Sequence, residues 1–392
     1  MERSTIYCYR LLFITIKINQ RMKSSNFFFI LSFVLGSLTM FSQGLVIPNT
    51  NTNYKCEAGR TIGMTNIAVK WNAPGVKGRE GNIFGTPIAP YGMNVLGFGS
   101  DVESPWRAGA DECTTISFST DVTVNGEELK AGKYAFFIEL AEDKCVLIFN
   151  KNVNGWGSYF YNASMDVLRV NATPQTDMAT SKERLEYTFS NQTATSVDIA
   201  MEWEHWRIPF TVKMDVNSTV LASIKDQMTS GIGFNPQSLT AAAAWCLTND
   251  VNHEQALNWI NRAEDPNLGG SATFNSISTK AGLLTKLGKV EIADEEMKKA
   301  VKIGNAFELH VYGRQLLAQS KVDEALNVFQ INYDRNKGAW PTNVGLMRGY
   351  SAKGDFKKAL KYAKIALENA PDALNKSNLE AAIKSFEAGK AI

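Results

Sequence analysis

The sequence has few of the residues on which metal and nucleic-acid chemistry depend. Its 392 residues include only three histidines and five cysteines, too few for most metal clusters. Basic residues number 41 and acidic residues 39, so no basic surplus is available for nonspecific binding to nucleic acid. Charged residues make up 20% of the chain and apolar residues 44%, which argues against a disordered protein. We therefore expect globular domains with no metal site, no cofactor and no nucleic-acid partner.

Common catalytic signatures are also missing. The sequence contains no GxSxG nucleophile elbow and no HExxH zinc motif. The GFGS stretch at 97–100 is not followed by Gly-Lys-Ser/Thr, so it does not predict a phosphate-binding loop. His205 continues the inward phase of an alternating apolar run and is expected to be packed in a core. These absences favour a noncatalytic protein, although they leave an enzyme open.

The N-terminal segment has the layout of a secretory signal peptide. Residues 27–41 form an uncharged apolar run of about 15 residues, shorter than the roughly 20 needed to span a membrane. Lys23 precedes this run, and small or polar residues follow it. Met22 directly precedes Lys23, so we expect translation to start there and 1–43 to be the signal peptide region. A retained N-terminal membrane anchor is the alternative.

The predicted signal peptide also predicts where the protein resides. We expect an exported protein, periplasmic or extracellular, without a membrane span after the signal is removed. The stretch 44–59 is expected to be a linker that leads into the first domain.

The hydrophobic pattern from 60 to 216 has a period of two. Apolar residues alternate with polar ones in runs that begin at Ile67, Ile116, Tyr134, Cys145, Leu168, Leu185, Val197 and Ile208. Turn signals such as Asn125-Gly126 separate the runs. Alternation of this kind is typical of strands with one buried face. About eight or nine short strands predict an antiparallel β-sandwich, with a flattened barrel as the alternative.

Four cysteines lie beyond the signal peptide region: Cys56, Cys113, Cys145 and Cys246. We expect them to be small buried apolar residues. Export would also permit disulfides, and a bond between Cys113 and Cys145 is the pair to test first.

The pattern from 217 to 392 changes to the helical period, and alanine becomes frequent. Ala256, Ala293, Ala325 and Ala359 recur in similar contexts at spacings of 37, 32 and 34 residues. Repeats of this length are typical of tetratricopeptide-like helix pairs, in which small residues let the helices approach closely. We predict an α-helical tetratricopeptide-like repeat array. Asn375 to Lys390 is expected to be its C-terminal capping helix.

Several motifs in the first domain occur in a recognisable order. They are PGVKGR at 74–79, IFG at 83–85, PYG at 90–92 and WRAGADECTTISF at 106–118. With these motifs, residues from about 56 to 215 resemble domain-of-unknown-function family 2911, which is found in exported bacterial proteins. Several members carry helical repeats after this domain. The resemblance therefore implies an architecture but no activity.

Two features depart from that family. The segment from Met93 to Pro105 is inserted between PYG and the Trp-Arg pair, which puts the local loop geometry in doubt. Asp111 stands where the family more often has Asn.

The region from Gly78 to Gly109 is the best candidate for a binding loop. It holds seven Gly and three Pro in 32 residues and shows no clear periodicity, and long loops of this kind are often functional. The candidate ligand-binding residues in and near it are Arg79, Tyr91, Trp106, Arg107, Asp111, Trp156 and Tyr159. Aromatic rings beside Arg and carboxylate groups suit a sugar or peptide ligand. The structural alternative is that Arg107 and Asp111 pin the loop while Trp106 plugs the sandwich.

Asp111 and Glu112 are the weak candidates for catalytic residues. As neighbours on a strand they would face opposite sides, which is poor geometry for a cooperating acid and base.

Three interpretations of function remain open. The favoured one is an exported noncatalytic binding or scaffold protein, with a protein partner on the helical repeats and a small ligand at the sandwich loop. The second is a periplasmic hydrolase acting on glycans or peptides through acidic residues. The third is a purely structural envelope protein.

Overall fold

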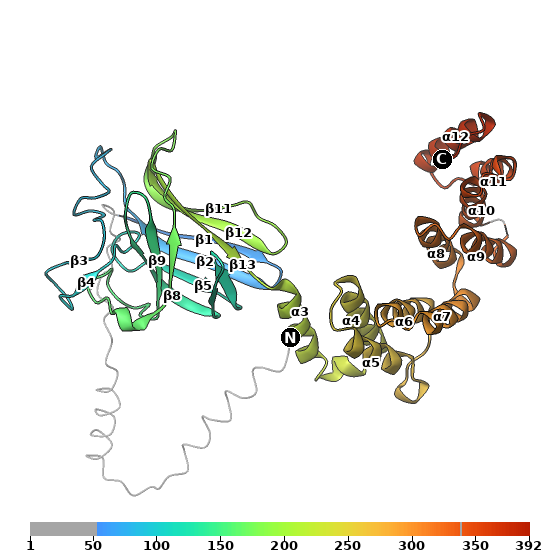
Figure 1. Ribbon diagram of the computed structural model, residues 1–392, viewed down its shortest axis with the longest axis horizontal. Helices are drawn as coiled ribbons and strands as arrows, with labels where there is room; N and C mark the ends of the chain where they lie inside the picture. Colours follow the sequence, from blue (N-terminus) through green and yellow to red (C-terminus); the bar gives the residue numbers. More distant parts are fainter. Residues whose placement is uncertain (1–52, 338) are drawn as a thin grey trace, which may run out of the picture. The chain divides into compact units, whose positions relative to one another are not determined.

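The computed structural model describes residues 53–337 and 339–392 (Figure 1). The expected signal peptide region at 1–43 lies outside these residues. Strands occupy the first part of the described chain and helices the second, as the hydrophobic periods predict. Within the described residues, no helix combines the length and apolarity needed to cross a membrane.

The first sheet has six antiparallel strands in the order β1-β2-β5-β8-β9-β10. Their bounds are β1 (Tyr54–Ile62), β2 (Thr65–Ala73), β5 (Thr115–Phe118), β8 (Gly132–Glu139), β9 (Cys145–Asn150) and β10 (Asp166–Ala172). Most residues of its edge strand β1 are exposed.

The second sheet has five strands in the order β11-β12-β13-β6-β7. They are β11 (Lys182–Ser190), β12 (Ser196–Glu204), β13 (Trp206–Lys213), β6 (Val122–Val124) and β7 (Glu127–Leu129). A separate hairpin joins β3 (Asn94–Val95) to β4 (Glu103–Ser104). The described strands thus form a β-sandwich with an added hairpin, and not the flattened barrel.

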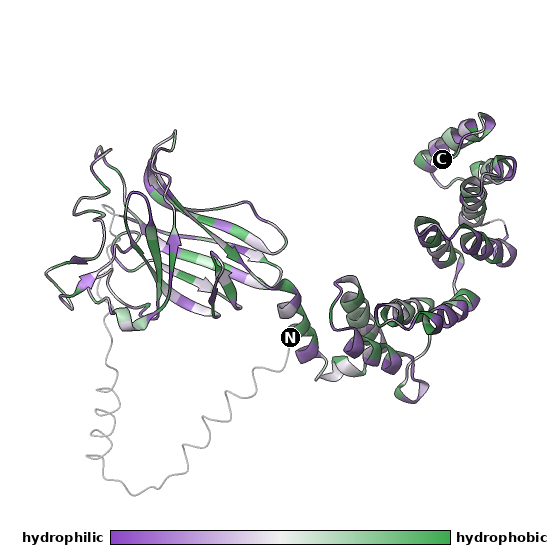
Figure 2. Ribbon diagram, viewed as in Figure 1, coloured by the Kyte–Doolittle hydropathy of each residue, from purple (hydrophilic) through white to green (hydrophobic). Residues whose placement is uncertain are grey.

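One continuous hydrophobic cluster fills the space between the two sheets, from Ile62 to Met214. Hydrophobic and hydrophilic residues alternate along the strands that enclose it (Figure 2). The Trp71 indole N–H crosses between the layers and donates to the Leu185 carbonyl at 2.9 Å. Because this buried N–H finds a partner, the tryptophan can lie in the core without an unsatisfied donor.

The strand count differs from the prediction of eight or nine, because the described chain contains thirteen strands, β1 to β13. The eight alternating runs correspond to eight of the nine strands that have four or more residues, and β1 is the exception. β1 begins at Tyr54, inside the stretch 44–59 expected to be a linker. It shows little alternation because most of its residues are exposed. β6 and β7 have three residues each and flank the predicted turn, where Asn125 and Gly126 have φ of 47° and 95°.

A second, smaller layer covers the outer face of the first sheet. Cys113, Phe137, Ile148 and Tyr161 are buried together there. Cys145 instead lies in the main core. The two cysteines therefore pack in different layers, and both have free thiols, as do Cys56 and Cys246. The disulfide proposed between Cys113 and Cys145 is wrong for this structure, and burial raises the pKa of both thiols.

The helical region contains consecutive antiparallel hairpins that resemble a tetratricopeptide array. Its helices are α3 (Val216–Gln227), α4 (Pro236–Thr248), α5 (His253–Glu264), α6 (Phe274–Lys286), α7 (Val290–Ile303), α8 (Ala306–Ala318), α9 (Val322–Arg335), α10 (Trp340–Ala352), α11 (Phe356–Glu368) and α12 (Ala373–Glu387). Four of the hairpins are α4–α5, α6–α7, α8–α9 and α10–α11, and α12 packs on α11. α12 begins two residues before the expected capping helix (375–390) and ends three residues before its end.

Small residues let these helices pack closely. The four recurring alanines are all buried, with Ala256, Ala325 and Ala359 fully inaccessible. Phe329 occupies a socket formed by three helical glycines: a Cβ added at Gly313, Gly345 or Gly349 would lie within 3.1 Å of its ring. The close approach of α8 and α10 to α9 therefore depends on residues without side chains.

The junction between α7 and α8 is held by side chains of α9. Arg335 donates to the carbonyls of Val301 and Gly304, both at 2.7 Å, and so satisfies the C-terminal end of α7. Asn332 donates to the Ala306 carbonyl at 2.8 Å. Asn305 and Glu308 form a capping box at the start of α8. These contacts fix the place where α8 begins beside α7.

Candidate functional site

The sequence-predicted ligand residues fall into separate groups in the structure. Trp106 is 5% exposed and stacks on Trp203 with ring centroids 6.2 Å apart and an interplanar angle of 7°. Its backbone pairs with Ile138 in a β-bridge. Trp106 therefore belongs to the sandwich core, which is the structural alternative that the sequence left open.

Arg107, Asp111 and Tyr159 form a second group. The Arg107 guanidinium donates to the backbone carbonyl of Asp111 at 3.0 Å and lies 4.9 Å from the Tyr159 ring centroid. The same guanidinium fills the space above Gly157, where a Cβ would lie 2.4 Å from it. Arg107 thus joins its own loop to the loop that contains Gly157 and Tyr159. Its guanidinium group contacts these protein groups and not an open cavity.

The inserted segment from Met93 to Pro105 carries the β3–β4 hairpin and packs on the Tyr159 loop. The Ser100 backbone N–H donates to the Tyr159 carbonyl at 2.8 Å, and Phe98 meets the Tyr159 ring edge-on at 5.5 Å. Phe98 and Trp156 nevertheless expose 68% and 52% of their surface. The insertion therefore has an ordered place in the fold, with aromatic side chains left exposed beside it.

Arg79 and the two candidate catalytic carboxylates form hydrogen bonds with other groups of the protein, which fix the local backbone. Arg79 donates to the carbonyls of Val76 and Gly75, within its own loop. Asp111 and Glu112 lie in an irregular segment before β5, not on a strand as expected. The Asp111 carboxylate accepts a hydrogen bond from Asn53 at 3.0 Å.

Glu112 accepts from Lys55 at 2.8 Å and from Asn72 at 2.7 Å. The hydrogen bond from Lys55 lowers the pKa of this carboxyl, and the Asn72 amide lowers it further. Glu112 is therefore ionised at neutral pH, which suits a strand-bridging carboxylate and not a general acid.

Tyr91 is the one predicted ligand residue that lines a large cavity in the sandwich. This acidic pocket has a volume of about 830 Å³ and is lined by Glu80, Gly81, Phe84, Tyr91, Glu142, Thr176, Asp177, Met178, Glu204, His205 and Trp206. It contains four carboxylates and no Lys or Arg among these residues. Phe84 and Trp206 stack at 4.2 Å to form an aromatic wall.

The β12–β13 turn supplies the polar groups nearest that wall. Glu204 is 4% exposed, has φ of 54°, and accepts a hydrogen bond from the Gly81 backbone N–H. His205 lies in the same turn and is only partly buried, so the expectation of a packed core histidine is wrong. Its Nδ1 is 2.6 Å from the Met178 carbonyl, and because a carbonyl only accepts, Nδ1 carries the proton.

Tyr91 links this pocket to the first sheet. Its hydroxyl donates to Glu142 at 3.2 Å. Burial and the neighbouring Glu142 charge both raise the pKa of Tyr91. Its ring packs against Gly85, where a Cβ would lie 2.7 Å away. Tyr91 therefore stays protonated and presents a fixed ring edge to the pocket. Trp156 and Tyr159 do not line this pocket.

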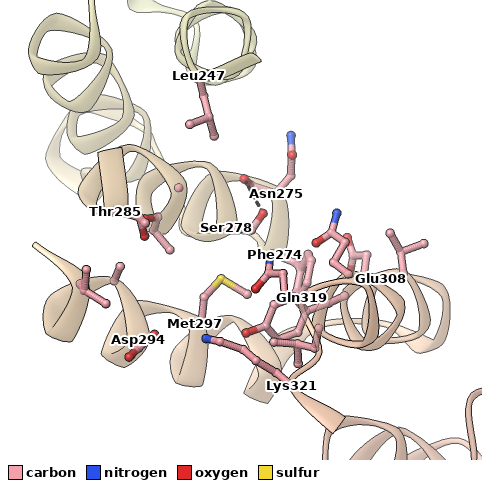
Figure 3. Close-up of a pocket in the computed structure, with 18 of the residues that line it drawn as sticks. Leu247, Phe274, Asn275, Ser278, Thr285, Asp294, Met297, Glu308, Gln319 and Lys321 are labelled. Atoms are coloured by element: carbon pink, nitrogen blue, oxygen red, sulfur yellow. Dashed lines mark hydrogen bonds between the residues drawn. The ribbon is translucent and has the colours of Figure 1, made fainter. Parts of the chain in front are cut away.

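The helical region contains a second large cavity, the α6–α8 groove. Its volume is about 720 Å³, and α6, α7 and α8 contribute most of its lining (Figure 3). Its apolar walls include Phe274, Met297, Val311 and Tyr312. Met297 extends from α7 toward Phe274 (Figure 3), whose ring meets Tyr312 edge-on at 6.4 Å.

Polar side chains line the rim of the α6–α8 groove. Asn275, Ser278 and Thr285 come from α6, Gln315 comes from α8, and Gln319 is the residue that caps the C-terminal end of α8. Charges of both signs are also present, although Lys286 is already paired with Asp250 at 2.7 Å. A mostly apolar concavity with a few hydrogen-bonding groups is the usual composition of a binding site.

A third cavity, the α8–α12 groove, adjoins it across α8. It has a volume of about 410 Å³ and is lined by Phe307, His310, Val311, Arg314, Trp340, Pro341, Val344, Met347, Arg348, Asn375, Asn378, Leu379, Ala382 and Ile392. Phe307 and Val311 line both grooves. Phe307 is 69% exposed at the second position of α8.

Sequence analysis did not single out these groove residues. The signal that could have drawn attention to Phe307 is an aromatic residue at the second position of a helix, where an acidic residue is favoured. Within the described residues, no group of three or more His, Cys, Asp or Glu side chains is arranged to hold a metal ion.

Comparison with known proteins confirms the family resemblance over the sandwich. Residues 54–212 match the family described as Protein of unknown function (DUF2911). No curated protein matches the chain. Among solved structures, the helical region is similar to YrrB, described as a TPR protein with an unusual peptide-binding site. The identity is 17%, the match covers 42% of this chain and 83% of that chain, and the TM-score is 0.29.

Proposed function

We propose that this chain is an exported, noncatalytic scaffold whose helical array binds a protein partner through the α6–α8 groove. The observation that carries the proposal is the groove itself, an apolar concavity with polar rim groups on the faces of stacked helix pairs. Repeat arrays present surfaces of this kind to peptides and partner proteins. The exposed ring of Phe307 at the edge of the groove adds an apolar anchor point.

The dimensions and chemistry of the groove suit a peptide segment. A volume of about 720 Å³ accommodates a few side chains, within the range of about 300–1,000 Å³ common for binding pockets. Phe274 and Tyr312 supply an aromatic wall for apolar side chains. Asn275 and Gln319 offer amides that can both donate to and accept from a peptide backbone.

Peptide selection tests this proposal. Random peptides displayed on phage are selected against the whole immobilised protein, and the enriched peptides are then titrated against two variants. Phe307→Asp places a charge in the groove, whereas Leu374→Asp is the matched control. Both residues are exposed apolar residues at the second position of a helix, and Leu374 lines neither groove. Aspartate is favourable at that helix position, so both variants should fold.

We expect Phe307→Asp to weaken the enriched peptides by about tenfold or more, which is the effect of losing roughly 1.4 kcal/mol of apolar contact. Leu374→Asp should bind them like the wild type. Failure to enrich any peptide would contradict the proposal, and so would equal binding to both variants.

The hydrogen bonds of the candidate carboxylates support the noncatalytic part of the proposal. Glu112 is held by Lys55 and Asn72, which are strand residues, and Asp111 by Asn53, the residue before β1. Removing their charge should therefore lower stability and not a turnover rate. Glu112→Gln is expected to lower the melting temperature, and a hydrolytic activity that disappears in this variant without loss of stability would favour the hydrolase instead.

A small-ligand function of the sandwich is the second candidate, and the acidic pocket favours it. Four carboxylates beside the stacked Phe84 and Trp206 rings suit a positively charged group such as the amine of an amino sugar or a basic peptide side chain. Glucosamine and N-acetylglucosamine are suitable probes, because only the first carries a positive charge.

Ligand-observed NMR distinguishes the two probes. We expect line broadening for glucosamine and none for N-acetylglucosamine. The broadening should disappear in the Glu142→Gln/Asp177→Asn double variant and persist in Asp143→Asn, a control that does not line the pocket. Equal signals from both sugars would contradict a cationic ligand.

The export part of the proposal rests on the apolar run at 27–41. The mass of the purified exported protein gives its N-terminus directly. A mass corresponding to cleavage near Gln43 is expected. An intact Met1 or Met22 would contradict cleavage.

A further inference from the structure

The acidic pocket of the sandwich contains a buried carboxylate that no basic side chain offsets. Glu204 lines the pocket and is 4% exposed. Within residues 53–337 and 339–392, it has no Lys, Arg or His within ion-pair distance, and its carboxylate accepts from the Gly81 backbone N–H. Burying a charge without a counter-charge is costly, so buried carboxylates are usually paired. Glu204 is therefore a buried charge that faces a cavity and lacks a cation.

The neighbouring Glu202 shows how a carboxylate on this strand is normally paired. Both residues belong to β12, and both are buried. Glu202 lies 3.1 Å from the Arg207 Nε and 3.6 Å from the Lys182 Nζ. Lys182 stands opposite Glu204 in the β11–β12 register, yet its ammonium group binds Glu186 and Glu202. The second sheet therefore supplies cations to Glu202 and leaves Glu204 open to the pocket.

The other charged and polar side chains of the pocket are mainly hydrogen-bond acceptors. Glu80, Glu142 and Asp177 line the pocket and are exposed, so they mark its mouth. His205 donates its Nδ1 proton to the Met178 carbonyl, which leaves Nε2 of the neutral imidazole as an acceptor. Because no Lys or Arg belongs to the lining, the pocket suits a cation that carries several N–H donors.

The aromatic wall of the pocket favours a planar cation. Phe84 and Trp206 stack with ring centroids 4.2 Å apart and an interplanar angle of 15°, and the Tyr91 ring lies 6.2 Å from Trp206. A guanidinium group is flat, stacks on aromatic faces and directs several N–H donors outward in one plane. An ammonium group is a compact point charge that is more strongly hydrated, so it loses more when it leaves water. A flat wall beside surplus acceptors therefore favours guanidinium over ammonium.

We propose that the acidic pocket binds the guanidinium group of an arginine. Glu204 accepts hydrogen bonds from this group, the Trp206 ring stacks on its face, and the carboxylates at the mouth attract the positive charge. This inference rests on the small-ligand function proposed for the sandwich and names the cation that the pocket selects. The arginine belongs either to a peptide chain or to the free amino acid, because both present the same group.

The first test needs no ligand. In the whole chain, Glu204→Gln removes the charge and keeps an oxygen that can accept from the Gly81 N–H. We expect a higher urea midpoint than in the wild type, because an uncompensated buried charge is removed. Glu202→Gln is the matched control on the same strand, and it should lower the midpoint because Arg207 loses its carboxylate. A midpoint of Glu204→Gln at or below that of the wild type would mean that Glu204 has a stabilising partner and would overturn the proposal.

The second test measures binding to the whole protein by isothermal titration calorimetry. Nα-acetyl-arginine methylamide is compared with its lysine analogue and with its citrulline analogue, which has a neutral urea group in place of the guanidinium. We expect the arginine compound to bind at least about tenfold more tightly than the citrulline compound, the effect of losing a hydrogen bond to a charged group. Equal affinity for these two compounds would overturn the proposal.

Free L-arginine distinguishes the two sources of the guanidinium group. Its α-carboxylate is repelled by the acidic mouth, so the blocked compound should bind more tightly if the ligand is a peptide. Tighter binding of free L-arginine would assign the pocket to the amino acid instead, with the same guanidinium contact.

The variants connect the binding to this pocket. Glu204→Gln should remove the difference between the arginine and citrulline compounds, whereas Glu202→Gln, which does not line the pocket, should keep it. The Glu142→Gln/Asp177→Asn double variant changes only exposed residues, so its fold is not at risk, and it should also weaken the arginine compound severalfold. Unchanged binding in Glu204→Gln and in the double variant would overturn the inference.

The lysine compound and glucosamine separate this inference from the proposed function. Both carry an ammonium group, and we expect both to bind more weakly than the arginine compound. Binding of either one as tightly as the arginine compound would overturn the guanidinium assignment and leave the cationic-ligand function standing. Absence of binding by all of these cations would count against both.

Discussion

The sandwich and the helical array bury their apolar residues in different ways. The sandwich has one continuous cluster that joins both sheets, whereas the described helices divide theirs among four smaller clusters. In the sandwich, residues more than one hundred positions apart share a contact, such as Trp71 and Leu185. In the array, contacts join neighbouring helix pairs. A repeat array is therefore expected to tolerate local changes that a single core does not.

The difference also explains where the binding surfaces lie. Loops of the sandwich are fixed by contacts such as the hydrogen bond from Arg107 to the Asp111 carbonyl. Polar groups that form such bonds within the protein are not free to bind a ligand. The array leaves concave faces between its helices, such as the α6–α8 groove with its apolar walls and polar rim. The following predictions test this contrast, beginning with the largest expected effect.

Trp203→Ala should destabilise the sandwich by about 3–5 kcal/mol, the usual cost of deleting a buried aromatic side chain. Trp203 is 1% exposed, and its ring lies 6.2 Å from Trp106 and 5.9 Å from Phe84. Urea unfolding followed by helical ellipticity should leave the transition of the array in place, while tryptophan fluorescence reports an earlier transition. A single shifted transition would mean that the two regions share one cooperative core.

The array should lose stability as the pH falls from about 6.5 to about 4. Burial, helped by the nearby Arg348 and Arg314, lowers the pKa of His310 from 6.5 to about 4 in the folded state. In that pH range the unfolded chain therefore binds a proton that the folded chain does not, so stability is full above the range and declines through it. The loss should total roughly 2–4 kcal/mol at 1.36 kcal/mol per pKa unit.

His310 donates from Nδ1 to the Pro341 carbonyl at 2.9 Å. His310→Asn provides the control, because an amide can still donate to the Pro341 carbonyl but does not titrate. Urea midpoints of the array are measured across this pH range for both proteins. The wild type should lose stability relative to the variant. Parallel curves would show that His310 is not held neutral by its surroundings.

Gly345→Ala should destabilise the array by about 1 kcal/mol. Alanine is favoured over glycine in a helix by about 1 kcal/mol, but overpacking a filled core costs about 1–3 kcal/mol. The added Cβ would lie 2.5 Å from the Phe329 ring. In a Phe329→Leu background the smaller side chain leaves room, and the same change should become neutral or stabilising. A double-mutant cycle without coupling would contradict the glycine socket.

Arg107→Ala should have the smallest effect, about 0.5–1 kcal/mol. The variant loses one hydrogen bond to the Asp111 carbonyl and the contact over the Tyr159 ring. The melting temperature of the sandwich should fall by a few degrees. An unchanged melting temperature would indicate that Arg107 is retained for a ligand.

Much of the fold could be predicted from the sequence because its periodicities are local. The eight alternating runs mark eight of the nine strands that have four or more residues, and the recurring alanines mark the helix pairs. β1 was missed because an edge strand with mostly exposed residues has little alternation. β3 and β4 have two residues each, too few to show any period.

The sites were less predictable because they depend on contacts between distant residues. Tyr91 was expected to bind a ligand, and it lines a pocket. Trp106 is instead buried in the core of the sandwich, and Arg107 packs against Tyr159. Glu204 looked like an ordinary strand carboxylate in the sequence. Whether a basic partner stands beside it depends on how distant loops fold over the β12–β13 turn, which no local pattern encodes.

Amide hydrogen exchange of the whole chain, with and without a selected peptide, tests the central claim most directly. The account predicts slower exchange in α6, α7 and α8 when the peptide is bound, and unchanged exchange in the strands of the sandwich. Protection centred on the sandwich strands or on the Tyr159 loop, with none in these helices, would contradict it.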